Sequence, residues 1–325
     1  MTESTRIVVR KFGGPDVLEL ETVDLAPPAA GEIQVRNTAI GLNFLDCYQR
    51  SGLYPMSLPF VPGNEAAGIV EKVGEGVTAF KPGDRVVSKT PPGAYATLRN
   101  LPERNLAHIP NGVSDDVAAA IYLKGLTAFY LLKLTFPVGP GHTIVVSAAA
   151  GGVGQILTQW GRSLGAKVIG IAGGPAKCAR VRESGCEIVI DSLSDDIVTK
   201  VREATGGKGA DVVYDSVGKD TFESSLDCLK PRGLMVSFGN STGPVAVPNL
   251  GILASKGSLF VTRPTLAHYF PDAASERAAA RELFDAYLVG TFKIRVGQEF
   301  ALSDVQSAHQ AIESRATSGA TIIRP

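Results

Sequence analysis

The chain has 325 residues, of which 44% are apolar, enough for two domains of ordinary size. Lysine and arginine number 32, as do aspartate and glutamate, so no net charge attracts nucleic acid or an anionic membrane. No apolar run approaches the roughly 20 residues of a membrane-spanning helix, and residues 1–12 lack the apolar block of a secretion signal. We therefore expect a cytoplasmic protein with small-molecule ligands, no principal nucleic-acid partner and no membrane.

Residues 1–124 show the pattern of a mostly β domain. Alternating apolar segments occur at 5–10, 32–40 and 67–73. Turn clusters separate them, such as Gly13-Gly14-Pro15 and Lys81-Pro82-Gly83-Asp84.

From about residue 125 the hydrophobic pattern changes to short apolar runs typical of buried strands, separated by segments long enough to form helices. The six runs read TIVVS, KVIGIA, EIVID, DVVYDS, LMVSF and SLFVT. This alternation predicts an α/β fold, a doubly wound six-stranded parallel sheet of the Rossmann type, over residues 125–267. Two helical stretches follow, and we expect them to return to the first domain, which then comprises 1–124 and 268–325.

A glycine-rich loop joins the first strand of that sheet to its first helix. Residues 148–154 read AAAGGVG. Glycines let the backbone approach a pyrophosphate, which the N–H groups at the helix N-terminus then bind. Gly151, Gly152 and Val153 are predicted to lie there. Ala149 holds the first glycine position of the common G-x-G-x-x-G form, which a negative φ allows.

The end of the second strand indicates which nicotinamide dinucleotide is preferred. An acidic residue there would bind the ribose 2′-hydroxyl of NAD. Residues 171–177 read IAGGPAK, with no carboxylate and with Lys177 in the following helix. We expect room for a 2′-phosphate beside Gly173, and therefore NADPH.

The cysteines and histidines show no spacing typical of catalysis or metal binding. The cysteines are Cys47, Cys178, Cys186 and Cys228, without paired spacings, and we expect reduced thiols. The histidines are His108, His142, His268 and His309, with no H-x-x-x-H pair, and no nucleophile elbow occurs. The sequence thus disfavours hydrolases and metalloenzymes, and we assign no metal ligand.

Several stretches resemble the zinc-free quinone oxidoreductases, the zeta-crystallin-like branch of the medium-chain dehydrogenase/reductase superfamily. They are 39–46 (AIGLNFLD), 52–54, 63–68 (GNEAAG), 148–154, 214–218 (YDSVG) and 237–241 (SFGNS). The resemblance covers essentially the whole chain. It implies a GroES-like substrate domain built from both chain ends, with the Rossmann domain inserted between them. It also implies a homodimer formed through the nucleotide domain, for which residues 249–253 and the SLFVT run could supply a strand edge.

The resemblance also bears on the reaction. Zinc alcohol dehydrogenases of the superfamily bind their catalytic metal with residues that match Asn43, Asn64 and Lys124 here, none a plausible zinc ligand. Without a Lewis acid, an alcohol is a poor substrate, whereas a quinone accepts hydride directly. The resemblance thus implies zinc-independent, NADPH-dependent quinone reduction by hydride transfer from nicotinamide. A reductase of conjugated enones or alkenals, and a non-catalytic NADPH-binding protein, remain alternatives.

Site residues follow from the same resemblance. The catalytic candidates are Asn43, Asp46, Tyr48, Tyr54 and Lys124. The expected cofactor contacts are Asn43, Tyr48, Thr127, Gly151, Gly152, Val153, Gly173, Lys177, Ser192, Phe238, Gly239, Asn240, Ser241, Val261, Thr262 and Arg315. Asn43 and Tyr48 would donate hydrogen bonds to the nicotinamide ribose or the acceptor oxygen, and Tyr54 and Phe238 would form apolar walls. Ser192 replaces a tyrosine that close relatives place beside the adenosine phosphate, which predicts weaker discrimination between NADPH and NADH.

Overall fold

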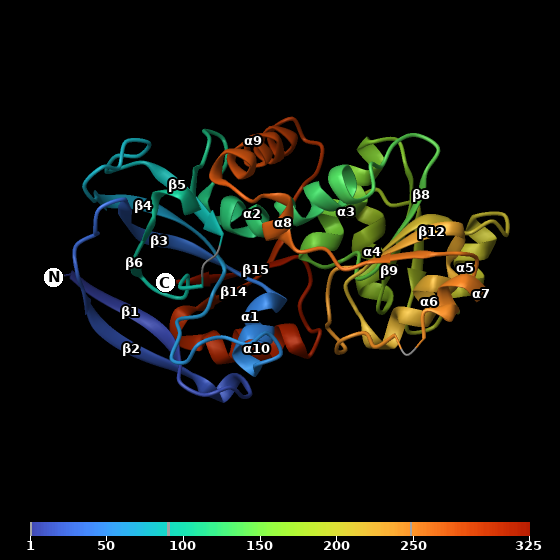
Figure 1. Ribbon diagram of the computed structural model, residues 1–325, viewed down its shortest axis with the longest axis horizontal. Coiled ribbons are helices and arrows are strands. Elements are labelled where there is room, and N and C mark those ends of the chain that lie inside the picture. Colours follow the sequence, from blue (N-terminus) through green and yellow to red (C-terminus); the bar gives the residue numbers. More distant parts are fainter. Residues whose placement is uncertain (1, 90–91, 248) are drawn as a thin grey trace. The chain divides into compact units, whose positions relative to one another are not determined.

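The computed structural model describes residues 2–89, 92–247 and 249–325. The chain divides into two compact units (Figure 1). The first unit comprises Met1–Leu126, Asp272–Leu288 and Ile294–Pro325, and the second comprises Thr127–Pro271 and Val289–Lys293.

The first unit is mostly β, as its alternating apolar segments predict. Its strands are β1 (Thr2–Val9), β2 (Leu18–Leu25), β3 (Glu32–Leu42), β4 (Glu65–Val73), β5 (Arg85–Lys89), β6 (Leu98–Pro102), β7 (Leu106–His108), β14 (Val296–Ala301) and β15 (Ala320–Arg324). β1 and β2 form an antiparallel pair, and the others form a seven-stranded sheet in the order β14-β15-β3-β4-β5-β7, with β6 paired to β3. The predicted segments 5–10, 32–40 and 67–73 correspond to β1, β3 and β4.

Besides these strands, the first unit contains helices. They are α1 (Phe44–Ser51), α2 (Asp115–Tyr130), α9 (Ala273–Leu288) and α10 (Val305–Glu313), of which α2 continues into the second unit. On α10 the buried residues are Val305, Ala308, His309 and Ile312, and their spacing places them on one helical face. His309 therefore points into the core.

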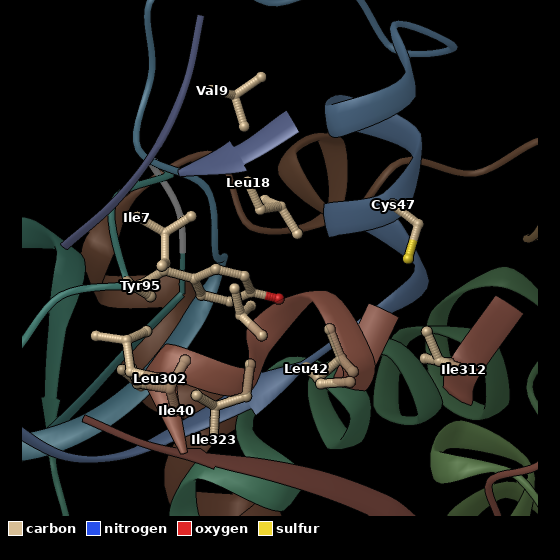
Figure 2. Close-up of a cluster of buried hydrophobic side chains, with 14 of the residues drawn as sticks. Ile7, Val9, Leu18, Ile40, Leu42, Cys47, Tyr95, Leu302, Ile312 and Ile323 are labelled. Carbon is tan, nitrogen blue, oxygen red and sulfur yellow. The ribbon is translucent and has the colours of Figure 1, made fainter. Parts of the chain in front are cut away.

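A buried cluster joins α1, α10 and the sheet of the first unit. Figure 2 shows the ring of Tyr95 among aliphatic side chains of this cluster, including Ile7, Ile40 and Leu302, with Cys47 on helix α1. Burying an aliphatic side chain of this size contributes about 1.5–3 kcal/mol. The cluster therefore holds the start of α1, which carries several of the predicted site residues, against the sheet.

The second unit contains the predicted doubly wound sheet. Its strands are all parallel, in the order β10-β9-β8-β11-β12-β13. The strands are β8 (Thr143–Val146), β9 (Lys167–Ala172), β10 (Ile188–Asp191), β11 (Ala210–Asp215), β12 (Leu229–Ser237) and β13 (Phe260–Thr262). The helices are α3 (Gly152–Ser163), α4 (Pro175–Glu183), α5 (Ile197–Ala204), α6 (Phe222–Asp227), α7 (Gly251–Ser255) and α8 (Leu266–Tyr269). The Rossmann prediction is confirmed.

The expectation that no apolar run approaches the length of a membrane-spanning helix requires correction. The segment Asp115–Thr135 is helical over 21 residues with a mean hydropathy of 1.5 in its most apolar window, so by length and composition it could cross a membrane. However, 78% of that window is buried inside the protein. Such burial is typical of a core helix, and apolar character all around a helix indicates burial as readily as a membrane.

The cysteines agree with the expectation of reduced thiols. All four are buried and free, and Cys47 belongs to the core cluster shown in Figure 2. Burial raises the pKa of the Cys228 thiol to about 12, so this side chain packs as a small apolar group.

Candidate active site

Three residues of the first unit meet at a buried carboxylate, Glu65, the first residue of β4. Its Oε2 accepts hydrogen bonds from Lys124 Nζ at 2.7 Å and from Asn43 Nδ2 at 3.0 Å. Its Oε1 accepts from the backbone N–H of Leu123 at 2.7 Å. The Glu65 side chain is fully buried, so its charge is compensated by Lys124 and these donors. Two of the predicted catalytic residues are thus brought together.

Gly41 makes this arrangement possible. A Cβ at position 41 would lie 2.2 Å from the carbonyl oxygen of Ala119 in α2 and 2.5 Å from Glu65 Oε2. Both approaches are closer than any side-chain carbon tolerates, so a glycine is required where β3 passes between α2 and Glu65.

The amide of Asn43 is oriented by its neighbours. Its Nδ2 donates to the Gly41 carbonyl oxygen at 3.1 Å and to Glu65 Oε2 at 3.0 Å. Both partners are acceptors, which assigns the amide nitrogen unambiguously. Both amide hydrogens are therefore engaged within the protein, and the side chain also accepts from the backbone N–H of Asp46 in a capping box.

Asp46, in the first turn of α1, is a second buried carboxylate. Its Oδ2 accepts from the Asn43 backbone N–H and from Tyr95 Oη, both at 2.9 Å, and its Oδ1 accepts from Asn64 Nδ2 at 2.6 Å. Burial raises the Asp46 pKa to about 6, although the hydrogen bonds from Asn64, Asn43 and Tyr95 oppose this rise. At neutral pH the group is therefore ionised and caps the first turn of the helix.

The positions that match zinc ligands in alcohol dehydrogenases are engaged in this network instead. Asn43 and Lys124 bind Glu65, and Asn64 donates to Asp46 and to Gln49 Oε1, the latter at 2.7 Å. A protonated ammonium has no lone pair for a metal, and zinc prefers thiolate, imidazole and carboxylate ligands. Within the described ranges, no three His, Cys, Asp or Glu side chains gather where they could hold a metal ion. The residues present do not fit a zinc site.

The two predicted tyrosines lie together beside this network. The ring centroids of Tyr48 and Tyr54 are 5.3 Å apart, and that of Phe44 lies 6.0 Å from Tyr48. The Tyr54 backbone N–H donates to the Tyr48 carbonyl at 3.0 Å, which fixes the segment after α1. Both tyrosines are half-buried, so α1 carries an aromatic surface next to its buried polar start.

In the second unit, the glycine loop enters α3 in the manner that a pyrophosphate site requires. Gly151 is the N-cap, and no side chain caps the first N–H groups of the helix. A Cβ on Gly154 would lie 2.2 Å from the Ala148 carbonyl oxygen, so the first turn of the helix packs closely on the backbone of the preceding loop. The left-handed residue of the loop is Ala148, with φ +46°, one place before Ala149. The uncapped N–H groups suit a phosphate anion.

The turn after β9 also contacts a residue of the neighbouring strand β10. Residues 171–177 contain no carboxylate, but β10 pairs with β9 so that Asp191 lies beside Ala172. Asp191 Oδ1 accepts from the backbone N–H of Gly174 at 2.7 Å and of Leu193 at 3.0 Å. A carboxylate thus does stand at this turn, supplied by the neighbouring strand.

Ser192 and Gly173 lie close to each other at this turn. Ser192 Oγ is 3.4 Å from the position that a Cβ on Gly173 would take. Gly174 has φ +87°, and Lys177 follows in the first turn of α4. Three predicted cofactor contacts are therefore gathered at the ends of β9 and β10.

The remaining predicted contacts of the second unit follow β12 or lie in β13. Phe238 N–H donates to the Asp215 carbonyl at 2.7 Å, and a Cβ on Gly239 would lie 2.3 Å from the Ser216 carbonyl oxygen. Arg263, which sequence reasoning missed, donates to the carbonyl oxygens of Ser237 at 2.9 Å and Gly239 at 3.0 Å. These loops stand at the carboxyl end of a parallel sheet, where such folds bind ligands. The group comprises Phe238, Gly239, Asn240, Ser241, Val261 and Thr262.

Two predicted cofactor contacts lie elsewhere. Thr127 is the first residue of the second unit and lies within α2. Arg315 belongs to the first unit, follows α10 directly and has φ +59°, with its backbone N–H donating to the Ile312 carbonyl at 3.1 Å.

A parallel nucleotide-binding sheet and a GroES-like unit with a buried polar network together define a medium-chain dehydrogenase/reductase. The family model "Zinc-binding dehydrogenase" matches residues 152–279, and "Alcohol dehydrogenase GroES-like domain" matches residues 29–111.

Individual proteins match along their whole length. A quinone oxidoreductase of Salmonella typhimurium is 50% identical over 99% of this chain and 100% of its own. A 2-haloacrylate reductase of a Burkholderia species is 44% identical over 98% of both chains. The structure of Escherichia coli quinone oxidoreductase complexed with NADPH superimposes with a TM-score of 0.96 and 49% identity, covering 99% of this chain and 100% of the other. The chain belongs to the quinone oxidoreductase family, which confirms the resemblance.

Proposed function

We propose that this protein is a zinc-independent, NADPH-dependent quinone oxidoreductase. One observation carries the proposal: Asn43, Asn64 and Lys124, which by the family resemblance match the metal-binding positions of zinc-dependent members, are instead engaged with Glu65 and Asp46. A site without a Lewis acid favours an acceptor that is already electrophilic. Quinones meet this condition, and alcohols do not.

NADPH is the cofactor that the residues of the second unit suit. The uncapped N–H groups of α3 would bind the pyrophosphate, and Lys177 would bind the 2′-phosphate, for which the family resemblance also implies Arg315. Phe238, Gly239, Asn240, Ser241, Val261 and Thr262 would contact the nicotinamide half, together with Thr127. When bound, NADPH supplies the hydride that reduces the acceptor.

The residues of the first unit position the acceptor and the nicotinamide ribose. Asn43 Oδ1 would accept from a ribose hydroxyl in addition to the Asp46 backbone N–H, since the amide hydrogens are engaged by Gly41 and Glu65. Lys124 carries three N–H donors and supplies positive charge for an oxygen that becomes negative. Tyr48 would donate from the aromatic surface of α1, and Tyr54 with Phe238 would form walls for a flat ring. Asp46 holds the start of α1 in place through its hydrogen bonds with Asn43 and Asn64 and does not contact the acceptor.

A reductase of conjugated enones or alkenals is the second candidate. The observation that favours it is the 44% identity to a 2-haloacrylate reductase, because a haloacrylate is an activated alkene. A protein that binds NADPH without turnover is the third possibility.

Steady-state NADPH oxidation with a panel of quinones, conjugated enones and alkenals distinguishes these functions. We expect the highest kcat/KM with quinones. A higher kcat/KM with enones would assign the second function. NADPH binding by titration, together with no turnover of either class, would assign the third and refute the proposal.

We further propose a homodimer formed through the edge strand β13. Phe260 in this strand is 57% exposed, and Leu250 just before α7 is 73% exposed, which is unusual for large apolar side chains of a monomer. Sedimentation equilibrium should give twice the 34.0 kDa chain mass, and Phe260→Lys should lower it. A mass near one chain would contradict this arrangement.

We also propose a cytoplasmic location, with no principal nucleic-acid partner and no membrane. The balanced charges and the burial of the apolar α2 segment support this.

A further inference from the structure

A chain of three buried side chains, which starts at Arg50 on α1 and passes through His309 on α10, leads to Asp46. Arg50 Nη1 lies 3.2 Å from His309 Nδ1, and His309 Nε2 lies 3.0 Å from Tyr95 Oη. Tyr95 Oη in turn donates to Asp46 Oδ2 at 2.9 Å. The four residues are at most 2% exposed, so water does not compete for these contacts. Nothing in the proposed reaction uses Arg50, His309 or Tyr95.

Arg50 is itself fixed at the start of this chain. Its guanidinium donates to both carboxylate oxygens of Glu313, at 2.6 and 3.1 Å, and Nε donates to the Gly13 carbonyl at 3.1 Å. A bidentate arginine–carboxylate pair of this kind has a defined geometry. The end of α10 is thereby tied to α1.

The direction of every hydrogen bond in the chain follows from Arg50. A guanidinium only donates, so His309 Nδ1 must accept, and the single proton of the neutral ring must lie on Nε2. Burial and the charge of Arg50 lower the His309 pKa to about 3, which keeps the ring neutral. Nε2–H therefore donates to Tyr95 Oη, and the hydroxyl hydrogen of Tyr95 points at Asp46.

This direction leaves Asp46 with donors on every side. Its partners are the hydroxyl of Tyr95, the backbone N–H of Asn43 and the amide of Asn64. A protonated carboxyl would need an acceptor, and none of these three offers one in this arrangement. Protonation of Asp46 must therefore break at least one of these three contacts, two of which hold Asn43 and Asn64.

We propose that Arg50, His309 and Tyr95 form a fixed chain of hydrogen-bond donors that keeps Asp46 a carboxylate and so holds Asn43 and Asn64 in their working positions. The three are positioning residues. This inference rests on the proposed function, since it assigns Asn43 to the site, but it concerns residues outside that site.

Other charged and titratable groups face Asp46 from the surrounding elements. Lys124 on α2 favours its ionised form, and the Cys47 thiol and Arg50 belong to α1 itself. The Cys47 thiol lies 3.5 Å from His309 Nδ1, and Glu313 ends α10. Burial raises the pKa values of Cys47 and Tyr95 well above their usual range, so neither changes charge between pH 5 and 8.

The variant Tyr95→Phe tests the proposal through the pH profile of kcat/KM for the quinone. The parent should lose activity as pH falls through about 6, where Asp46 takes up a proton. Removing one hydrogen bond to the carboxylate should move this acid limb upward by about one pH unit. Activity at pH 8 should remain within about threefold of the parent, because Asp46 is still ionised there.

Tyr122→Phe is the matched control. Tyr122 is also fully buried in the first unit, and its hydroxyl donates to a buried carboxylate, Glu276 Oε1, at 3.0 Å. This variant should lose stability without moving the acid limb. An acid limb in Tyr95→Phe that coincides with that of the parent, or a shift of equal size in Tyr122→Phe, would overturn the proposal.

If Tyr95→Phe does not fold, two substitutions of His309 test the same chain, because one keeps and the other removes the hydrogen-bond donor to Tyr95. His309→Gln retains an N–H for Tyr95 and should keep the acid limb near that of the parent, whereas His309→Leu should raise it. Equal profiles for the two would refute the chain. A parent protein that reduces no acceptor would instead refute the proposed function, so the two failures are distinguishable.

Discussion

Replacing Lys124 with methionine is expected to lower the free energy of unfolding by about 3–5 kcal/mol, because the buried Glu65 carboxylate loses its cation. The Glu65 side chain is fully buried, Lys124 is 6% exposed, and Nζ lies 2.7 Å from Oε2. Methionine preserves an unbranched apolar chain, so the loss reports the charge and little of the packing. Urea-induced unfolding at pH 7, followed by far-ultraviolet circular dichroism, measures the change.

A double variant and an exposed pair serve as controls for this prediction. Lys124→Met combined with Glu65→Gln removes both charges and should recover much of the lost stability. Lys200→Met breaks an ion pair with Glu203 whose side chains are 49% and 59% exposed, and should change stability by at most about 1 kcal/mol. If Lys124→Met unfolded at the same urea concentration as the parent, Glu65 would not depend on this cation.

The substitution Lys177→Ala is expected to raise the NADPH dissociation constant about ten- to a hundredfold, since a charge-assisted contact to phosphate contributes about 1.5–3 kcal/mol. Lys177 lies in the first turn of α4, after the Gly173–Gly174 turn. NADH binding should hardly change, because NADH has no 2′-phosphate. Fluorescence titration with both dinucleotides measures the effect, and Arg315→Ala should act in the same direction.

Asp191 provides a variant with the opposite expected effect on NADPH. Asp191→Asn keeps an oxygen for the backbone N–H groups of Gly174 and Leu193 but removes the negative charge at this turn. NADPH binding should tighten about two- to tenfold, whereas NADH binding should not tighten, because NADH has no 2′-phosphate for the carboxylate to repel. The exposed Lys200→Ala should alter neither dinucleotide. If Lys177→Ala and Arg315→Ala both bound NADPH as the parent does, the phosphate site would lie elsewhere.

Local patterns predicted the second unit because each strand of its sheet is a short apolar run next to a turn or helix signal. The glycine loop was equally readable, since the close approach at Gly154 leaves no room for a side chain. The environment of helix α2 was harder to predict, because a helix that is apolar all around has a similar composition whether protein or lipid surrounds it.

The polar network could be predicted only in part. Asn43, Asp46 and Lys124 came from the family resemblance, but Tyr95 and His309 meet across 214 residues of chain, and no local spacing signals such a contact. Asp191 was missed for a related reason: β10 brings its carboxylate beside a turn that belongs to β9. Arg263 likewise acts on loops that precede it in the chain.

The central claim, NADPH-dependent quinone reduction without zinc, is tested most directly by NADPH oxidation with a quinone after prolonged dialysis against a chelator. Asn43, Asn64 and Lys124 are engaged with Glu65 and Asp46 and offer zinc no suitable ligands. We predict the same kcat/KM before and after dialysis, and no stoichiometric zinc by elemental analysis. Loss of activity on dialysis, with recovery on adding zinc, would contradict the account.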